Sequence, residues 1–585
     1  MNLETTGTTG QPTTPSWKRL DIETVATLVA TGVVGLLLFL CAVYAGPLWR
    51  DETNTINVAL MPLKELWSNL PFESFPPLWL LVVRGWSLLG MAGSDGGIRL
   101  LSFFVGLSFL GSIWLCARWI GCRAPTLIIA LLATIPAFLF TMSSNRAYGL
   151  AMCLLVLTFG TIWRLLERPT RSRLLAAGAA SLLFVHCVYY DAIFLCGILS
   201  GAAAVSVRRR HWMTLLQLLG IGAAGGATML IYLPVIRTGS VYAPLMQTPF
   251  SFSRLWAKLA DAVSQTGSAL PEGAGGSTLW VWIALTAMAA FLGITLQFRF
   301  QSVPESATEG IPRRTDLALF SILSLLFGTV AYTGFLFILQ FPTHAWYYMV
   351  LFTLCALCLE AMLAAGLRAL NPWGTLRISL LVLLGAFGFR STWQEAHTRR
   401  SNVDIIAAIL NEKAREGDLI VVQFAFEAIT FDRYYHGKAS WASIPPIESH
   451  KVHRSDLIWQ KMTQGPTMQP VLAQAETALK NGGSVWVVGH IDLVHSGNLP
   501  ASPAQPTAPS LRCLSQYAHY WGAQLSAWLL DHAIETHTLT TTLNQPINLF
   551  EDLPLLHFSG YKPETLPGRS EAPGKATRPD QAAAW

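Results

Sequence analysis

Two adjacent carboxylates, Asp51 and Glu52, follow the first long apolar segment of the chain, Ile22–Tyr44. If that segment crosses a membrane, the acidic pair lies at the depth of the lipid head groups. A partly desolvated carboxylate has a raised pKa and is a stronger base, which suits it to taking a proton from an attacking hydroxyl. Charged residues are also common at the ends of membrane helices. Position alone therefore leaves open whether the pair is catalytic or an interfacial marker.

Several other side chains could bind a phosphate or a sugar near this pair. Arg146 and Arg237 fall at the expected outer ends of later apolar segments, where a guanidinium offers two parallel donors to a phosphate. A membrane anchor explains Arg146 equally well. His344 and Tyr347 belong to a His-Ala-Trp-Tyr-Tyr run at another outer end. An aromatic belt at the membrane surface also explains the Trp and Tyr residues of that run.

Long apolar blocks must hold these residues in place. The 585 residues are 52% hydrophobic and 13% charged, against roughly 25% charged in soluble proteins. Blocks of about 20 apolar residues match a bilayer core of ~30 Å. Besides the first block, the clearest are Leu279–Leu296, Leu317–Leu339 and Trp346–Leu367. The sequence predicts a polytopic α-helical protein of the plasma (inner) membrane, surrounded by membrane lipids.

The net charge of +6 comes from short basic clusters between the apolar blocks. The positive-inside rule explains these clusters, so nucleic-acid binding is not expected. Taking them as cytoplasmic predicts about eleven crossings, a cytoplasmic N-terminus and everything after Arg399 outside. In this topology residues 76–90 do not cross, and residues 174–207 cross twice with an outer hairpin near His186–Asp191.

The composition divides the chain into four parts. We expect a disordered cytoplasmic tail (1–20), a transmembrane part (21–399) with its first external loop at 46–75, a small extracytoplasmic α/β domain (400–562) and a disordered tail (563–585). In the α/β domain, Leu419–Val422 and Ser484–Gly489 are predicted strands, and Asp404–Arg415 is a predicted helix. No motif in this domain indicates a chemistry.

Five features recur together in an order that resembles a known family. They are the Asp-Glu pair, an amphipathic stretch at Ala59–Leu70, Pro-Pro-Leu-Trp at Pro76–Trp79, a Gly-to-Arg-Leu-Leu-Ser step from Gly90 to Ser102, and Arg-x-Tyr at Arg146–Tyr148. The order resembles the membrane glycosyltransferases of the GT-C fold that use polyprenyl-phosphate-linked sugars. Bacterial protein O-mannosyltransferases and lipid A aminoarabinose transferases belong to that group. The resemblance covers roughly residues 20–400.

The resemblance implies roles for single residues. Asp51 matches the catalytic aspartate that deprotonates the acceptor, and Glu52 matches its acidic neighbour. The aminoarabinose transferases carry a Glu-Lys pair just before the proline. In that pair the Glu helps bind a metal and the Lys helps bind the carrier phosphate. Here Ser74 and Phe75 stand in those places, with Glu73 one step away, so a divalent metal (Mg or Mn) stays open. Substrate contacts are expected from a wider set: Glu52, Glu73, Arg146, Tyr148, Arg237, His344 and Tyr347.

The implied reaction is a single displacement with inversion at the anomeric carbon. The donor is a polyprenyl-phosphate-linked sugar, and the acceptor is an envelope glycan such as lipopolysaccharide, a lipid or a protein. The alternatives are a secondary transporter, for which no internal repeat is visible, and a non-catalytic envelope assembly protein. No phosphate-loop, serine-hydrolase or zinc motif occurs in the sequence.

Overall fold

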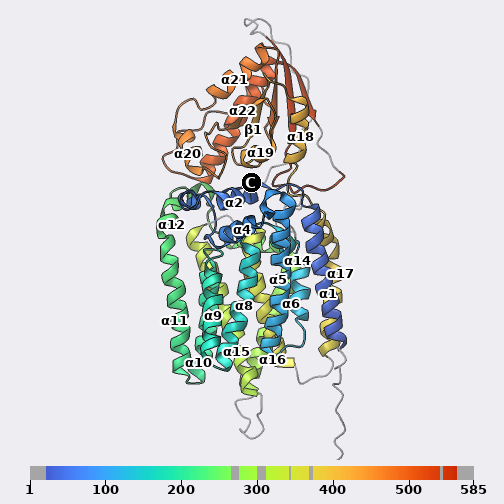
Figure 1. Cartoon of the computed structure of the whole chain (residues 1–585), viewed down its shortest axis with the longest axis vertical. Helices are drawn as coiled ribbons and strands as arrows, with labels where there is room; N and C mark the ends of the chain where they lie inside the picture. Colours follow the sequence, from blue (N-terminus) through green and yellow to red (C-terminus); the bar gives the residue numbers. More distant parts are fainter. Residues whose placement is uncertain are drawn as a thin grey trace, which may run out of the picture.

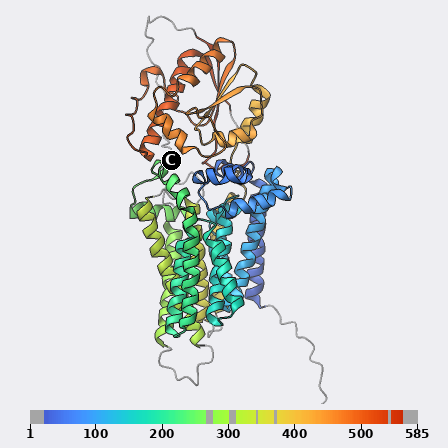
Figure 2. The ribbon, with the colours of Figure 1, turned by 60° about the vertical axis from the view of Figure 1, so that its left-hand side comes forward.

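The computed structural model describes residues 21–264, 276–299, 311–340, 344–367, 373–539 and 544–562. The two predicted tails, 1–20 and 563–585, lie outside the described residues. A bundle of long helices carries an α/β domain at one end, the upper end in Figure 1. Figure 2 shows the same stacking after a 60° turn.

Nine helical spans within the described ranges are long and apolar enough to cross a membrane. They contain α1 (Ile22–Tyr44), α5 (Asp95–Ile120), α8 (Tyr148–Glu167), α10 (Asp191–Arg208), α11 with α12 (Trp212–Met229, Leu233–Ser240), α14 (Gly276–Arg299), α15 (Ile311–Leu339), α16 (Met349–Leu367) and α17 (Trp373–Ala396). The predicted polytopic α-helical membrane protein is therefore confirmed.

The number of spans differs from the predicted eleven for two reasons. The helices α6 (Thr126–Ala133) and α7 (Pro136–Ser143) meet at a 90° bend and make a tenth span only if counted together. Pro136 causes this break, because proline cannot continue the helix that precedes it. The other difference is α9 (Arg171–Val185), whose 15 residues rise only about 22 Å at 1.5 Å each.

Short helices cover the upper end of the bundle. These are α2 (Arg50–Leu60), α3 (Leu63–Asn69) and the short helix η1 (Leu70–Phe72). The predicted amphipathic stretch, Ala59–Leu70, covers the last two residues of α2, all of α3 and the first residue of η1. The segment predicted not to cross forms α4 (Leu78–Leu88), which lies with α2 between the bundle and the α/β domain (Figure 1). Its 11 residues are too few to span a bilayer core, so that prediction is confirmed. The predicted hairpin is also present, between the end of α9 and the start of α10.

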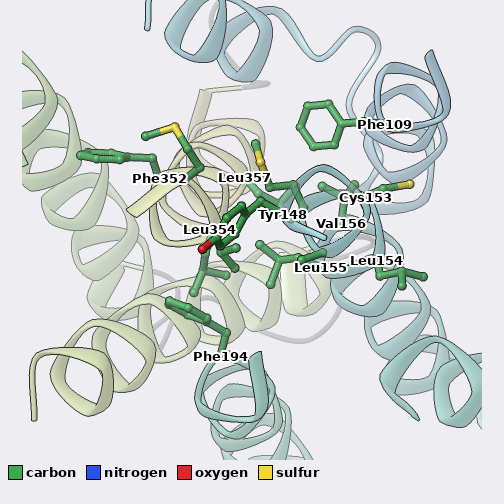
Figure 3. Packing of buried hydrophobic residues seen from close by; sticks show 14 of the residues in the cluster. Phe109, Tyr148, Cys153, Leu154, Leu155, Val156, Phe194, Phe352, Leu354 and Leu357 are labelled. Atoms are coloured by element: carbon green, nitrogen blue, oxygen red, sulfur yellow. The ribbon is translucent and has the colours of Figure 1, made fainter. Parts of the chain in front are cut away.

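The centre of the bundle is packed around α8 and α16. In the most apolar stretch of each of these two spans 78% of the residues are buried, compared with 28% in the corresponding stretch of α1. Figure 3 shows side chains of α8, including Tyr148 and Leu155, meeting Leu354 and Leu357 of α16. This packing fixes the upper end of α8, and with it the residues that immediately precede Tyr148.

The α/β domain contains one five-stranded sheet in the order β2-β1-β3-β5-β4. Strands β1 (Leu419–Gln423), β2 (Ser440–Ile444) and β3 (Ser484–Val488) are parallel, and β4 (Ala533–Leu539) and β5 (Leu555–Tyr561) add an antiparallel edge. The strands predicted at 419–422 and 484–489 are β1 and β3. The helices of this domain are α18 (Val403–Lys413), α19 (Ala428–Tyr434), α20 (Ser455–Thr463), α21 (Gln469–Lys480) and α22 (Leu511–His532).

Candidate active site

The acidic pair lies in the first turn of α2, and its two carboxylates have different environments. The side chain of Asp51 is 23% exposed, whereas that of Glu52 is 0% exposed. Glu52 accepts hydrogen bonds from the Arg99 guanidinium and from the backbone N–H of Asn145 at 2.7 Å. Consecutive residues of a helix point about 100° apart, so one carboxylate faces the bundle and the other faces the domain boundary.

Three cations or potential cations surround the Asp51 carboxylate. Its Oδ2 is 3.6 Å from Nη2 of Arg146, and its Oδ1 is 3.4 Å from Nε2 of His453 and 4.0 Å from Nε of Arg50. Burial raises the pKa of Asp51, but Arg146, His453 and Arg50 together outweigh it and hold the pKa well below its usual range. The expectation of a raised pKa is therefore wrong for this arrangement, because neighbouring positive charge exceeds the effect of desolvation.

Arg146 connects the exposed carboxylate to a buried one. Its Nη1 donates to the backbone oxygen of Asp51 at 2.8 Å and to Oγ1 of Thr55 at 2.9 Å, and lies 3.3 Å from Oε1 of Glu73. The guanidinium lies over the Phe75 ring, 4.4 Å from its centroid, which is a favourable cation–π position. Its Nη2 side faces Asp51, at a distance longer than a hydrogen bond.

Glu73 is enclosed by hydrogen-bond donors. Its side chain is 0% exposed, and Oε2 accepts from Asn54 at 2.8 Å and from Thr55 at 3.0 Å. Its other oxygen accepts from the backbone N–H of Ser74 at 2.9 Å. In this conformation Glu73 positions Arg146 and the end of η1, and a substrate could reach it only after rearrangement.

The aromatic candidates lie below and beside Arg146. Tyr148 is buried edge-to-face against Phe75, with 4.9 Å between ring centroids, and the ring centroid of Tyr347 lies 5.9 Å from that of Tyr148. His344 stacks on Trp346 at 4.5 Å, and burial lowers the pKa of its imidazole to about 4. His344 is therefore neutral at pH 7.

Arg237 is not brought into this group. It is exposed on α12, and across the described ranges no carboxylate pairs with its guanidinium. A phosphate could meet Arg237 at the rim of the bundle, but the contacts given above do not include it.

The residue that sequence reasoning missed is His453, which comes from the α/β domain. It precedes α20, and its backbone N–H donates to Oδ1 of Asn54 on α2 at 2.9 Å. Nearby, Asn57 of α2 donates to the backbone oxygen of Lys451 at 2.9 Å. The one signal in the sequence is the run His-Lys-Val-His-Arg at 450–454, where four of five side chains can carry positive charge.

Further hydrogen bonds and ion pairs join the α/β domain to the helical bundle near Asp51. Asp95 of α5 accepts from Arg433 at 2.8 Å and from the Tyr434 hydroxyl at 2.6 Å, and that hydroxyl accepts from the Leu48 N–H at 2.7 Å. Arg50 pairs with Glu427 and donates its backbone N–H to Glu551 at 2.9 Å. Burial raises the pKa of Glu551 to about 8 despite the neighbouring Arg50.

The carboxylates of this region do not form a metal-binding set. Asp51 and Glu73 both face the same guanidinium, that of Arg146, and Glu52 is closed off by Arg99. Over the ranges that the structure covers, no three His, Cys, Asp or Glu side chains gather as ligands. A Mg²⁺ or Mn²⁺ ion does not fit between Asp51 and Glu73 unless Arg146 moves away.

The chain has distant similarity to solved structures. No family model matches the chain, and no curated protein matches it. Two solved structures of ArnT from Cupriavidus metallidurans, one bound to undecaprenyl phosphate and one in the apo state, align over 79% of this chain and 92% of theirs. They are 14% and 16% identical to it, with TM-scores of 0.33 and 0.34.

Proposed function

We propose that the protein is an inverting glycosyltransferase that moves a sugar from a polyprenyl-phosphate donor to a hydroxyl of an envelope glycan, lipid or protein. The supporting observation is the pairing of Asp51 with Arg146. A partly exposed carboxylate faces a guanidinium at the upper end of a membrane bundle, beneath an extramembrane domain. In this proposal Asp51 is the proton acceptor, and Arg146 beside it is the cation that binds the phosphate.

In the proposed step, the acceptor oxygen attacks the anomeric carbon while the bond from that carbon to the phosphate oxygen breaks. The phosphate leaves with the bonding electrons, and the acceptor proton goes to Asp51. Neither of the neighbouring carboxylates in the described part of the chain, Glu52 and Glu73, is placed to act as a nucleophile, since both are enclosed. A lone base favours single displacement and inversion. Positioning and charge stabilisation would supply most of the rate.

Arg146 would link donor binding to the strength of the base. Its Nη1 is held by Asp51, Thr55 and Glu73, so Nη2 is the side that meets an arriving phosphate. A phosphate that draws the guanidinium charge toward itself weakens the effect that most lowers the pKa of Asp51. The carboxylate then becomes a stronger base when the donor is present.

The proposed orientation puts the upper end of the bundle and the α/β domain outside the plasma (inner) membrane and the N-terminus in the cytoplasm. Basic residues support it, because Arg209 and Arg313 form ion pairs with Asp316 and Glu167 at the opposite end. The second candidate, a secondary transporter, is disfavoured by the same pattern. Transport sites lie near the bilayer midplane, whereas these ion pairs and the Asp51 group lie at the two ends.

The test is mass spectrometry of envelope glycans, lipids and glycoproteins from cells with the full chain, with Asp51→Asn or without the protein. The expected result is one product carrying an added sugar, reduced at least about 100-fold by Asp51→Asn, as is typical when a general base is lost. Glu65→Gln is the matched control, because Glu65 is an exposed carboxylate on the neighbouring α3. Unchanged product with Asp51→Asn would refute the proposed base.

A further inference from the structure

The α/β domain supplies a side chain directly to the proposed site. Nε2 of His453 lies 3.4 Å from Oδ1 of Asp51, while Oδ2 of the same carboxylate faces Arg146 at 3.6 Å. We infer that His453 is a positioning residue for Asp51 and that the site is complete only when the domain is docked. This inference rests on the proposed function.

His453 is held through both its backbone and its ring. Its backbone N–H donates to Asn54 at 2.9 Å, and its ring packs edge-on against Phe426 with 5.2 Å between centroids. The residue after it, Arg454, lies over the Phe72 ring of η1 at 5.3 Å. The backbone around His453 is thus tied to α2 and η1, so its ring has a fixed direction relative to Asp51.

Asn54 connects His453 to the group that holds Arg146. Its side chain is buried in α2; its oxygen accepts from His453, and its nitrogen donates to Oε2 of Glu73 at 2.8 Å. Glu73 in turn faces Arg146. Both oxygens of the Asp51 carboxylate are therefore oriented by one connected set of contacts, one from the domain and one from the bundle.

The topology of the domain explains why it can deliver such a residue. The loop with His453 follows the carboxyl end of β2, and Phe426 and Glu427 follow the carboxyl end of β1. Parallel α/β sheets present their functional side chains at the carboxyl ends of the strands. Here that edge faces α2, because Glu427 pairs with Arg50 and Tyr434 contacts Leu48. The loops that follow the carboxyl ends of β1 and β2 therefore lie on the side of the domain that faces Asp51.

The chemical role is to fix one oxygen of the base. An Nε2–H directed at Oδ1 stabilises the carboxylate and prevents rotation about its Cβ–Cγ bond, so that Oδ2 stays directed at the space beside Nη2 of Arg146. The side chains of His453 and Asp51 are similarly exposed, at 22% and 23%. Both side chains are therefore partly accessible at the boundary between the bundle and the domain.

The experiment compares His453→Ala, His453→Gln and Lys451→Ala in the full chain. Membranes containing each variant use their own polyprenyl-phosphate-sugar pool as donor, and the rate of product formation is followed as acceptor is varied. We expect His453→Ala to lower kcat about tenfold or more with KM nearly unchanged, the pattern for losing an interaction made in the transition state. His453→Gln should restore most of that rate, because its amide N–H can replace the imidazole donor.

Lys451→Ala is the matched control, since Lys451 lies in the same loop and its exposed side chain pairs with Asp432, away from Asp51; the backbone oxygen that accepts from Asn57 is unchanged by this substitution. It should keep the unmodified rate. A wild-type kcat in His453→Ala overturns the inference, as does a Gln variant no faster than the Ala variant when both melt as the unmodified protein does. If Asp51→Asn abolishes transfer while His453→Ala does not, the proposed function stands and only this inference fails.

Discussion

Replacing Arg146 with methionine tests whether this guanidinium holds two carboxylates together. Arg146 is almost fully buried, with Asp51 at 3.6 Å on one side and Glu73 at 3.3 Å on the other. Methionine keeps much of the volume over the Phe75 ring and removes the charge. Glu73 would then be a buried carboxylate with only neutral donors, from Asn54, Thr55 and the Ser74 backbone.

The expected cost is about 3–5 kcal/mol, the usual penalty for removing one partner of a buried ion pair. Glu73→Gln in the same chain removes the uncompensated charge, so the double variant should recover part of the loss. Arg146→Met, Glu73→Gln and the double variant form a double-mutant cycle, in which contacting residues typically show coupling energies of about 0.5–3 kcal/mol. Because Asp51 also loses its strongest favourable neighbour, its pKa should rise toward the ordinary value in both Arg146 variants.

The assay is reversible unfolding of the purified full chain in detergent micelles, followed by tryptophan fluorescence. Arg237→Met is the matched control, because it makes the same substitution at an exposed guanidinium and should change stability by no more than about 0.5 kcal/mol. The reasoning is refuted if Arg146→Met is as stable as Arg237→Met. Strictly additive effects of Arg146→Met and Glu73→Gln would refute the proposed link between these two residues.

Two further predictions concern stability. The pKa of Glu551 is raised from 4.5 to about 8, so the folded chain binds this proton more tightly and stability should fall as pH rises from 4.5 to 8. Between pH 6 and 8 the loss is about 2 kcal/mol. The melting temperature of Glu551→Gln should therefore change less with pH over that range than that of the unmodified chain, and an equal pH dependence of the two melting temperatures would contradict this. Arg99→Met should cost about 3–5 kcal/mol by leaving Glu52 buried and unpaired, and Glu52→Gln in the same chain should recover part of it. A melting temperature unchanged by Arg99→Met would show that Glu52 does not depend on this pair.

The bundle could be predicted from the sequence because membrane helices depend mainly on local composition. A block of about 20 apolar residues has few stable alternatives to a spanning helix, and the basic clusters give it a direction. Residues 76–90 were correctly excluded because they are too short and contain Arg84. The end of α9 at Val185 agrees with the hairpin predicted near His186–Asp191. The difference in the number of spans comes from the length of α9, whose 15 residues are fewer than the roughly 20 that span a bilayer core.

The two strands predicted in the α/β domain were also local signals, since each is a short apolar run beside a glycine. The position of the domain was not predictable in the same way. Its contacts with α2 depend on single polar groups, such as the Tyr434 hydroxyl at Asp95 and the His453 N–H at Asn54. Pairs of this kind leave no periodic pattern in the sequence, so His453 could be found only after folding.

The environment of Asp51 shows why its pKa was predicted with the wrong sign. The argument from the sequence considered depth in the membrane, and burial does raise the pKa. The opposing charges come from Arg146 and His453, which are far from Asp51 in the chain and reach it only through the fold. For Glu52 the same fold brings Arg99 instead. Two neighbouring carboxylates of the sequence therefore have different environments: Asp51 is partly exposed at the proposed site, and Glu52 forms a buried ion pair with Arg99.

The aromatic residue at position 75 and the arginine at position 146 are best understood together. A lysine in place of Phe75 would add a second cation to this site. In this fold an ammonium group at that place would lie against the guanidinium of Arg146, which is 4.4 Å from the Phe75 centroid. Two cations in a buried site would repel each other, whereas an aromatic face attracts a guanidinium. The aromatic ring at position 75 and the guanidinium of Arg146 are therefore compatible parts of one arrangement. In it the positive charge beside Asp51 comes from Arg146, which lies far from Asp51 in the sequence.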